Sequence, residues 1–370
     1  MRFITVIFKK VNHMEKLLDL YRSFAERGRR VTRNQAVASL RRLIQPGRRQ
    51  EPLHPFWVIV GREMSDHIRS WRFIILLALI SLTCFGSLYT GLSNIGTPRA
   101  AGTEANKAFF FLQLFTTTDG TLPSFTVFLN FLGPLLGIAL GFDAINSELN
   151  RGTMSRLLSQ PVHRDYVLNA KFVGALLVIA TLFFALTLLM TGLGLIFIGV
   201  PPTASEFVRI LAFTLLTVLY VAFWLNIAIL FSVRFRQPAT SALCSIAVWL
   251  FLSVFYPILI KLVAKALAPQ PGPMAGLDSA AGDFQRTVIN LLRFAPGQLY
   301  SDATTTLLMP VVRSLGPLTM EQVVGAIPNP LPLGESILIV WPQLTGLVAA
   351  TVGCFVLSYI AFMRKEIRAR

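Results

Sequence analysis

The charged residues best placed to do chemistry gather in residues 143–171, where Glu148, Arg151 and Arg164 precede Lys171. Acids and bases that flank a short apolar face suit contacts with another protein. Catalysis is not predicted, because the four histidines of the chain are scattered and fit no metal-ligand spacing. The chain also has no Gly-x4-Gly-Lys-Ser/Thr loop to hold a nucleotide phosphate. We therefore predict no catalytic residue, metal or cofactor, and any energy for work must enter through a partner.

The pattern within this segment predicts a short helix between two breaks. Gly152 can end the preceding helix, Thr153 can cap a new one, and Pro161 can end it. Three apolar residues share one face of the new helix at positions i, i+3 and i+4: Met154, Leu157 and Leu158. Such a helix, lying parallel to a membrane, suits docking into a groove of a soluble partner. An ordinary loop is the alternative interpretation.

The elements that must hold this segment are membrane helices. The chain has 370 residues, of which 54% are hydrophobic and 14% charged, and its mean hydropathy is +0.62. A soluble protein of this size has roughly 25% charged residues. Apolar runs of about 20 residues or more, enough to cross a bilayer, occupy six ranges: 73–94, 122–142, 172–199, 208–232, 239–261 and 337–363. We predict an all-α polytopic membrane protein with six transmembrane helices. No ionisable residue lies in the middle of a span, which disfavours an ion-coupled transporter.

The distribution of positive charge predicts the orientation. Lys and Arg are concentrated in the loop after the second span, in the hairpin at 233–238 and in the tail. This bias places those parts and both termini in the cytoplasm, at a bacterial-type cytoplasmic membrane, so that residues 95–121 and 262–336 face outward. The net charge is +16, and residues 1–72 hold 16 Lys/Arg against 6 Asp/Glu. We expect this charge to meet anionic lipid rather than nucleic acid, because no aromatic residues interleave with it.

The chain divides into three parts. Residues 1–54 are predicted to form a basic, amphipathic cytoplasmic extension. Residues 55–72 hold Trp57 and Trp71 among arginines, which indicates an interfacial helix at the level of the lipid headgroups. Residues 73–370 form the six-helix transmembrane domain, and its outer loop at 262–336 carries amphipathic patches that predict two short helices over the outer mouth.

The second span carries glycine at four-residue spacing, at Gly133, Gly137 and Gly141. Glycines at this spacing let two helices approach closely. Two interpretations stay open, which are tight packing within one subunit and a moving or dimer-forming interface. If the contact moves, we expect Gly137→Leu to impair function and Gly137→Ala to be tolerated.

The sequence Glu148-x-x-Arg-Gly-Thr-Met-x-x-Leu-Leu-Ser-x-Pro-Val-x-Arg, followed by Lys171, resembles the cytoplasmic signature of the permease subunits of type 2 ABC exporters. The pair Arg62 and Glu63 before the first span is also similar. So is Phe294-Ala-Pro-Gly-Gln-Leu-Tyr-Ser-Asp-Ala, an outer-loop motif that includes Pro296 and Tyr300. The resemblance covers residues 55–370 and favours the branch with a large outer loop between spans five and six. The extension at 1–54 departs from the family pattern.

The resemblance implies a non-catalytic permease subunit that moves a substrate across the membrane and is powered by a separate ATP-binding subunit. The helix around Met154 would be a coupling helix seated on that subunit, which would itself bind ATP and Mg²⁺. Glu148 and Arg151 would stabilise the turn or pair with the partner, and residues 55–72 would be the connecting helix. Two permease chains, identical or different, would form a pair. Spans one, two and five of each chain would flank the substrate path between them. A membrane scaffold or force-transmitting subunit of the same fold, or a secondary transporter, is the alternative.

Overall fold

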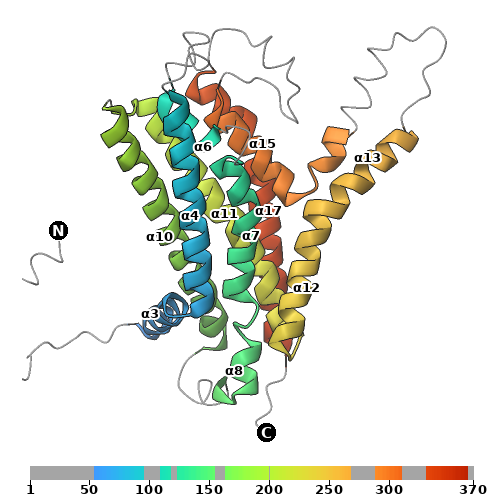
Figure 1. The fold of residues 1–370 in the computed structure, drawn as a ribbon. Helices are drawn as coiled ribbons and strands as arrows, with labels where there is room; N and C mark the ends of the chain where they lie inside the picture. Colours follow the sequence, from blue (N-terminus) through green and yellow to red (C-terminus); the bar gives the residue numbers. More distant parts are fainter. Residues whose placement is uncertain are drawn as a thin grey trace, which may run out of the picture. The chain divides into compact units, whose positions relative to one another are not determined.

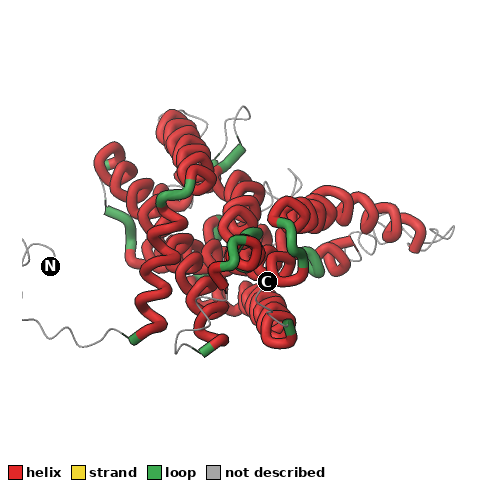
Figure 2. The backbone as a smooth tube through the Cα atoms, turned by 90° about the horizontal axis from the view of Figure 1, so that it is seen from below, coloured by secondary structure: helices red, strands yellow, loops and turns green. Residues whose placement is uncertain are grey.

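The computed structural model describes residues 54–95, 109–117, 123–154, 163–199, 201–267, 288–310 and 331–365. Within these ranges the regular structure is helical, with no strand, as Figure 2 shows by its red helices and green loops. The predicted extension at 1–54 lies outside the described residues, apart from His54.

Six helices in the described part of the chain are long and apolar enough to cross a membrane (Figure 1), which confirms the predicted all-α, six-span fold. They are α4 (Trp71–Ile95), α7 (Phe125–Gly141), α10 (Arg164–Ile198), α11 (Ala204–Arg234), the helix that begins with α12 (Pro238–Leu250), and α17 (Leu333–Arg364). The fifth span continues from α12 through a π-helical turn, η2 (Phe251–Phe255), into α13 (Tyr256–Leu267).

Two short elements mark one end of the molecule, and the second of them ends the candidate span that runs from Phe125 to Asn150. Helix α3 (Pro55–Ile68) lies across one end of α10, and the short helix α8 (Asn146–Asn150) lies beyond α7 at the same end (Figure 1). We call this the inner end and the opposite one the outer end. Helix α3 begins with Pro55, whose fixed backbone angle suits a first helical position.

The fourth span, α11, is the centre of the fold. It is the most buried of the six spans, and it packs against α7, α10, α15 and α17. Its Trp224 and Tyr220 are among the largest fully buried side chains of the described residues. Because lipid is as apolar as these side chains, close van der Waals packing rather than burial from water holds such a centre together.

The glycine ridge of the second span packs against α11 of the same chain. A Cβ atom at Gly137 would lie 2.6 Å from the carbonyl oxygen of Val221 and 2.9 Å from the backbone nitrogen of Leu225. At Gly141 it would lie 2.8 Å from the carbonyl oxygen of Leu225. Of the two sequence interpretations, the structure has tight packing within one subunit. The expectation that Gly137→Ala is tolerated is wrong, because the added methyl group would meet backbone atoms.

Part of the predicted outer loop is packed between the spans. Helix α15 (Pro296–Leu308) begins with Pro296, and its Tyr300 is buried. The ring of Tyr300 stacks on Tyr220, in the middle of α11, with 4.4 Å between centroids, and its hydroxyl lies 3.0 Å from that of Thr217. The two predicted helices are present, at 288–292 and in α15. The predicted place over the outer mouth is wrong for α15, which lies along the outer half of α11 because polar groups on both helices pair.

Arg209, near the outer end of α11, fixes the far end of α15. Its side chain is buried and donates hydrogen bonds to the carbonyl oxygens of Leu307, at 3.1 Å, and Leu331, at 2.7 Å. A third bond, of 3.0 Å, reaches the hydroxyl of Ser336 in the first turn of α17. One arginine thus joins the fourth span to the end of α15 and the start of the sixth span.

The predicted outer loop at 95–121 also contains a packed helix, α6 (Phe110–Thr116). Its residues Phe111, Leu112 and Leu114 are buried. The N–H of Phe111 donates a 3.1 Å hydrogen bond to Glu206, whose other carboxylate oxygen caps the start of α11 at Thr203. A carboxylate at the first turn of a helix offsets the partial positive charge of its free N–H groups. The sequence interpretation missed α6 because seven residues are too few to show a period.

Candidate functional site

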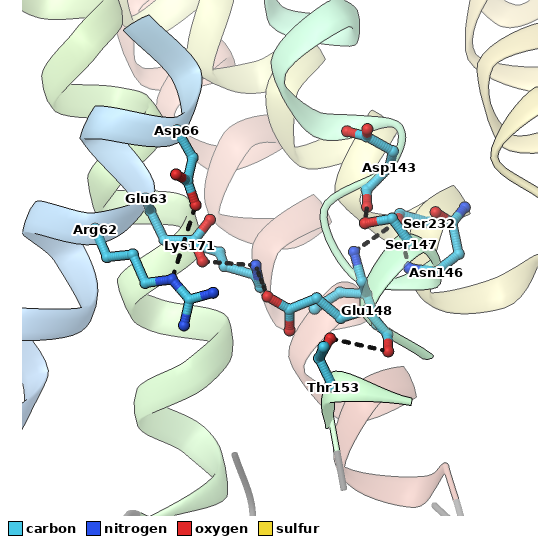
Figure 3. A network of polar contacts seen from close by, with 11 residues as sticks. Arg62, Glu63, Asp66, Asp143, Asn146, Ser147, Glu148, Thr153, Lys171 and Ser232 are labelled. Atoms are coloured by element: carbon cyan, nitrogen blue, oxygen red, sulfur yellow. Dashed lines mark hydrogen bonds and ion pairs between the residues drawn. The ribbon is translucent and has the colours of Figure 1, made fainter. Parts of the chain in front are cut away.

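The predicted chemistry-bearing segment meets two other elements at a buried lysine near the inner end. The ammonium group of Lys171, on α10, lies 2.8 Å from a carboxylate oxygen of Glu63 on α3 and 2.8 Å from one of Glu148 on α8 (Figure 3). The lysine side chain is only 5% exposed, and those of Glu63 and Glu148 are 12% and 17% exposed. One cation therefore joins two anions from separate helices, and we call these three residues the Lys171 network.

A glycine on α10 lets α3 come close enough to complete this network. Gly174 lies one turn from Lys171, and a Cβ atom there would lie 3.0 Å from Cβ of Glu63 and 3.4 Å from the carbonyl oxygen of Val60. A larger residue at this position would push α3 away from α10. Position 174 was not identified from the sequence, because a single glycine inside an apolar run has many explanations.

Hydrogen bonds attach the α8 segment to the central helix α11. The hydroxyl of Ser232 accepts from the backbone N–H groups of Ile145, at 2.9 Å, and Asn146, at 3.2 Å. The side-chain amide of Asn150 donates a 2.9 Å bond to the carbonyl oxygen of Arg236. In addition, Asp143 accepts a 2.7 Å bond from Arg72 at the start of the first span. The α8 segment is thereby joined to α10, α11 and α4, and through Lys171 to α3.

The turn after α8 follows the predicted pattern in part. Gly152 has a φ angle of 66°, a left-handed conformation that favours glycine where a helix ends. The hydroxyl of Thr153 donates a 3.3 Å bond back to the carbonyl oxygen of Glu148, and Arg151 is exposed. Met154 is 1% exposed and belongs to the main hydrophobic core. The structure thus turns Met154 toward the spans, where it is not available to the proposed docking face.

Three predicted residues of this segment, Leu157, Leu158 and Pro161, lie at 155–162, outside the described residues. Arg164 is described, and it bonds within the chain. Its guanidinium donates to the carbonyl oxygens of Phe362, at 2.6 Å, and Lys365 at the end of α17. It also lies over the ring of Phe362, 5.0 Å from the centroid. A cation there offsets the partial negative charge of a helix C-terminus, so Arg164 joins the third span to the sixth.

A half-buried histidine, His67, adjoins the Lys171 network on α3. Burial, followed by the charge of Lys171, lowers the pKa of His67 from 6.5 to about 4. An unfolded chain takes up a proton at His67 near pH 6.5, whereas the folded chain keeps the ring neutral until the pH approaches 4. The stability that His67 contributes is therefore complete above pH 6.5 and is lost as the pH falls from 6.5 to about 4.

We expect the thermal unfolding midpoint of the chain in lipid nanodiscs to fall less between pH 7 and pH 4.5 for His67→Gln than for the unchanged chain. The glutamine cannot be protonated, so it removes this proton uptake. His163, which is exposed, supplies the control substitution His163→Gln. If both variants follow the unchanged chain at every pH, His67 does not contribute to the acid sensitivity.

The helices that form this site fall within a known protein family. The model of the ABC-2 family transporter proteins matches residues 57–367. The chain belongs to this family. The match includes α3 and all six spans, and therefore every member of the Lys171 network.

Two named relatives of this ABC-2 chain are permeases by description. The probable ABC transporter permease protein NosY of Stutzerimonas stutzeri is 29% identical over 223 residues, which are 57% of this chain and 71% of that protein. The protein of the same name from Pseudomonas aeruginosa is 32% identical over 124 residues, 34% of this chain and 40% of that protein. The ABC-2 chain is thus a multi-pass permease subunit of an ABC transporter, and its family implies an ATP-binding partner.

Proposed function

We propose that this chain is a non-catalytic exporter subunit that moves a substrate across the cytoplasmic membrane when a separate ATP-binding subunit acts on residues 148–164. The observation that carries the proposal is the Lys171 network, in which Glu148 is held by a buried cation together with Glu63. Glu148, at the start of the segment that would receive the partner, is thereby tied to the third span. The partner would bind ATP and Mg²⁺, and the permease chain would need no cofactor.

The contacts of α8 support a route for the force. A partner seated on the segment after α8 would displace Glu148, and with it Lys171 on the third span. Ser232 would carry the same displacement to α11, because its hydroxyl bonds two backbone N–H groups of the α8 segment. Because α11 packs against α7, a movement at the inner end would reach the second span, which lies beside the substrate path in this proposal.

The working unit in this proposal contains two permease chains and two ATP-binding subunits. The fifth span is the least buried of the six spans within one chain. This low burial favours the presence of a second permease chain. Its exposed apolar residues would face the second chain or lipid. The inner end, with α3 and α8, would lie in the cytoplasm together with both termini, and α15 would lie toward the outside.

The test uses the complex purified from membranes with its ATP-binding subunit. We expect Glu148→Gln to leave insertion and the amount of chain unchanged, while substrate-stimulated ATP hydrolysis falls by about tenfold or more. Leu157→Pro, which would break the docking helix, is expected to have the same effect. The measurement is ATP hydrolysis per complex, with the amount of bound partner measured in the same preparation.

Glu335 supplies the matched control. It is an exposed carboxylate in the first turn of α17, at the outer end, and Glu335→Gln changes the same charge far from the proposed docking segment. Normal stimulated hydrolysis in both the Glu148→Gln and Leu157→Pro complexes would contradict coupling through residues 148–164.

A further inference from the structure

The fifth span contains an irregular turn whose cause is visible in the sequence. Five residues, Phe251–Phe255, form a π-helical turn between α12 and α13, and the N–H of Tyr256 bonds the carbonyl oxygen of Phe251 five residues earlier. Pro257 follows directly. Proline has no N–H for the carbonyl group four residues before it, and its ring clashes with that group, so the regular α-helical ladder is disturbed at this point. Turns of this kind are rare and bend helices.

Among the described residues the turn has few packed contacts: Leu252 packs against the main hydrophobic core, and α15 lies beside the turn. None of the five residues of η2 is buried. The side chains of Phe251, Val254 and Phe255 are 46%, 42% and 52% exposed. A close-packed protein interior resists a change of shape, whereas side chains with few packed neighbours do not. At this turn the fifth span therefore lacks its regular hydrogen bonds, and most of its side chains are not packed within the chain.

The two halves of the span pack against different parts of the chain. In α12, Ser241, Ser245 and Trp249 are buried, and the ring of Trp249 lies 4.8 Å from that of Phe131 on α7. Among the described residues, the main hydrophobic core contains none from α13. The inner half of the span thus belongs to the helix bundle, and the outer half does not.

The outer half has a small core of its own. Ala264 of α13 packs with Val288 and Leu292, and Tyr256 and Ile260 lie against them. The hydroxyl of Tyr256 also donates a 2.7 Å bond to the carbonyl oxygen of Leu291. We call α13 together with residues 288–292 the outer arm. It is joined to α15 by the three-residue connection 293–295 and by an ion pair at 3.8 Å between Arg293 and Asp302, which is longer than a hydrogen bond.

We propose that the π-helical turn is a hinge and that the outer arm moves about it as one body relative to the other spans. The hinge allows the bend to change because its hydrogen bonds are irregular and most of its side chains are exposed in the single chain. The arm moves as a unit because its own apolar contacts and the Tyr256 hydrogen bond are internal to it. In Figure 1, α13 leans away from the other spans toward its outer end.

The test measures distances between spin labels by double electron–electron resonance on the full chain in lipid nanodiscs. The three native cysteines are replaced by alanine, and labels are placed on exposed sites. The pair Lys261→Cys and Ala204→Cys spans the hinge, and the pair Lys261→Cys and Asn290→Cys lies within the arm. We expect the distance distribution of the first pair to be about twice as wide as that of the second. Leu262→Cys replaces the label at 261 if that variant does not fold.

A second substitution tests the cause of the movement. Pro257→Ala restores the missing N–H, so we expect it to narrow the distribution of the pair across the hinge and to leave the pair within the arm unchanged. Pro342→Ala, at another proline inside a helix, is the control and is expected to change neither. Equal widths for the two pairs, or no narrowing with Pro257→Ala, would overturn the hinge. This measurement needs no ATP-binding partner, so its outcome is independent of the proposed coupling.

Discussion

Replacing Lys171 by methionine is expected to lower the free energy of unfolding by about 3–5 kcal/mol. The ammonium group lies 2.8 Å from both Glu63 and Glu148, and the lysine side chain is only 5% exposed. Methionine has a similar shape but no charge, so two neighbouring carboxylates would stay buried without a cation. Unfolding of the chain in lipid nanodiscs, followed by heat or denaturant, measures the change.

Two further variants test whether the loss of stability comes from the unpaired buried charges. Lys261→Met removes an exposed lysine of α13 and is expected to leave stability within about 0.5 kcal/mol. Combining Lys171→Met with Glu63→Gln and Glu148→Gln removes all three charges, and we expect it to recover most of the lost stability. If Lys171→Met unfolds like Lys261→Met, the network does not stabilise the inner end.

Gly137→Ala is expected to destabilise the chain by about 1–3 kcal/mol, although it adds a single methyl group. That group would lie 2.6 Å from the carbonyl oxygen of Val221 and 2.9 Å from the backbone nitrogen of Leu225. Backbone atoms inside a helix cannot turn aside as a flexible side chain can, so α7 and α11 would have to separate. The thermal unfolding midpoint and the fraction of chain that elutes as a single species measure this effect.

Gly353 provides the matched control for this substitution. It also lies inside a spanning helix, α17, but a Cβ atom there would have no neighbour within 4 Å. We expect Gly353→Ala to be neutral or to stabilise the chain by up to about 1 kcal/mol, because alanine favours a helix more than glycine does. Equal unfolding midpoints for the two alanine variants would contradict the close contact of α7 with α11.

The six spans could be predicted because the signal for a membrane helix is local. A run of about 20 apolar residues satisfies its own backbone hydrogen bonds and matches the bilayer thickness, whatever surrounds it. The ends of the spans were less accurate. Helix α10, for example, begins at Arg164 rather than at 172, because polar residues continue a helix when a neighbour bonds them, and Arg164 bonds the end of α17.

The segment that forms the candidate site could be identified from the sequence, but not all of the residues that meet there. Glu148 and Lys171 were identified from their motif, yet the second acid of the network, Glu63, comes from 108 residues away. The pair of Arg62 and Glu63 was noted only as a family likeness, and nothing in its spacing indicates which charge it meets. Met154 was assigned to a docking face because helical periodicity finds an apolar face without saying what covers it.

The sequence by itself determined the number of spans, the all-α class and the place of the charged segment after the second span, because each depends on hydropathy and spacing within one stretch of chain. Only the tertiary structure decided what that segment touches and where α15 lies. Those outcomes depend on distant polar groups that pair inside the molecule, such as Tyr300 with Thr217 and Lys171 with Glu63. Such pairs leave no period in the sequence, since their partners are chosen by the packing of the helices.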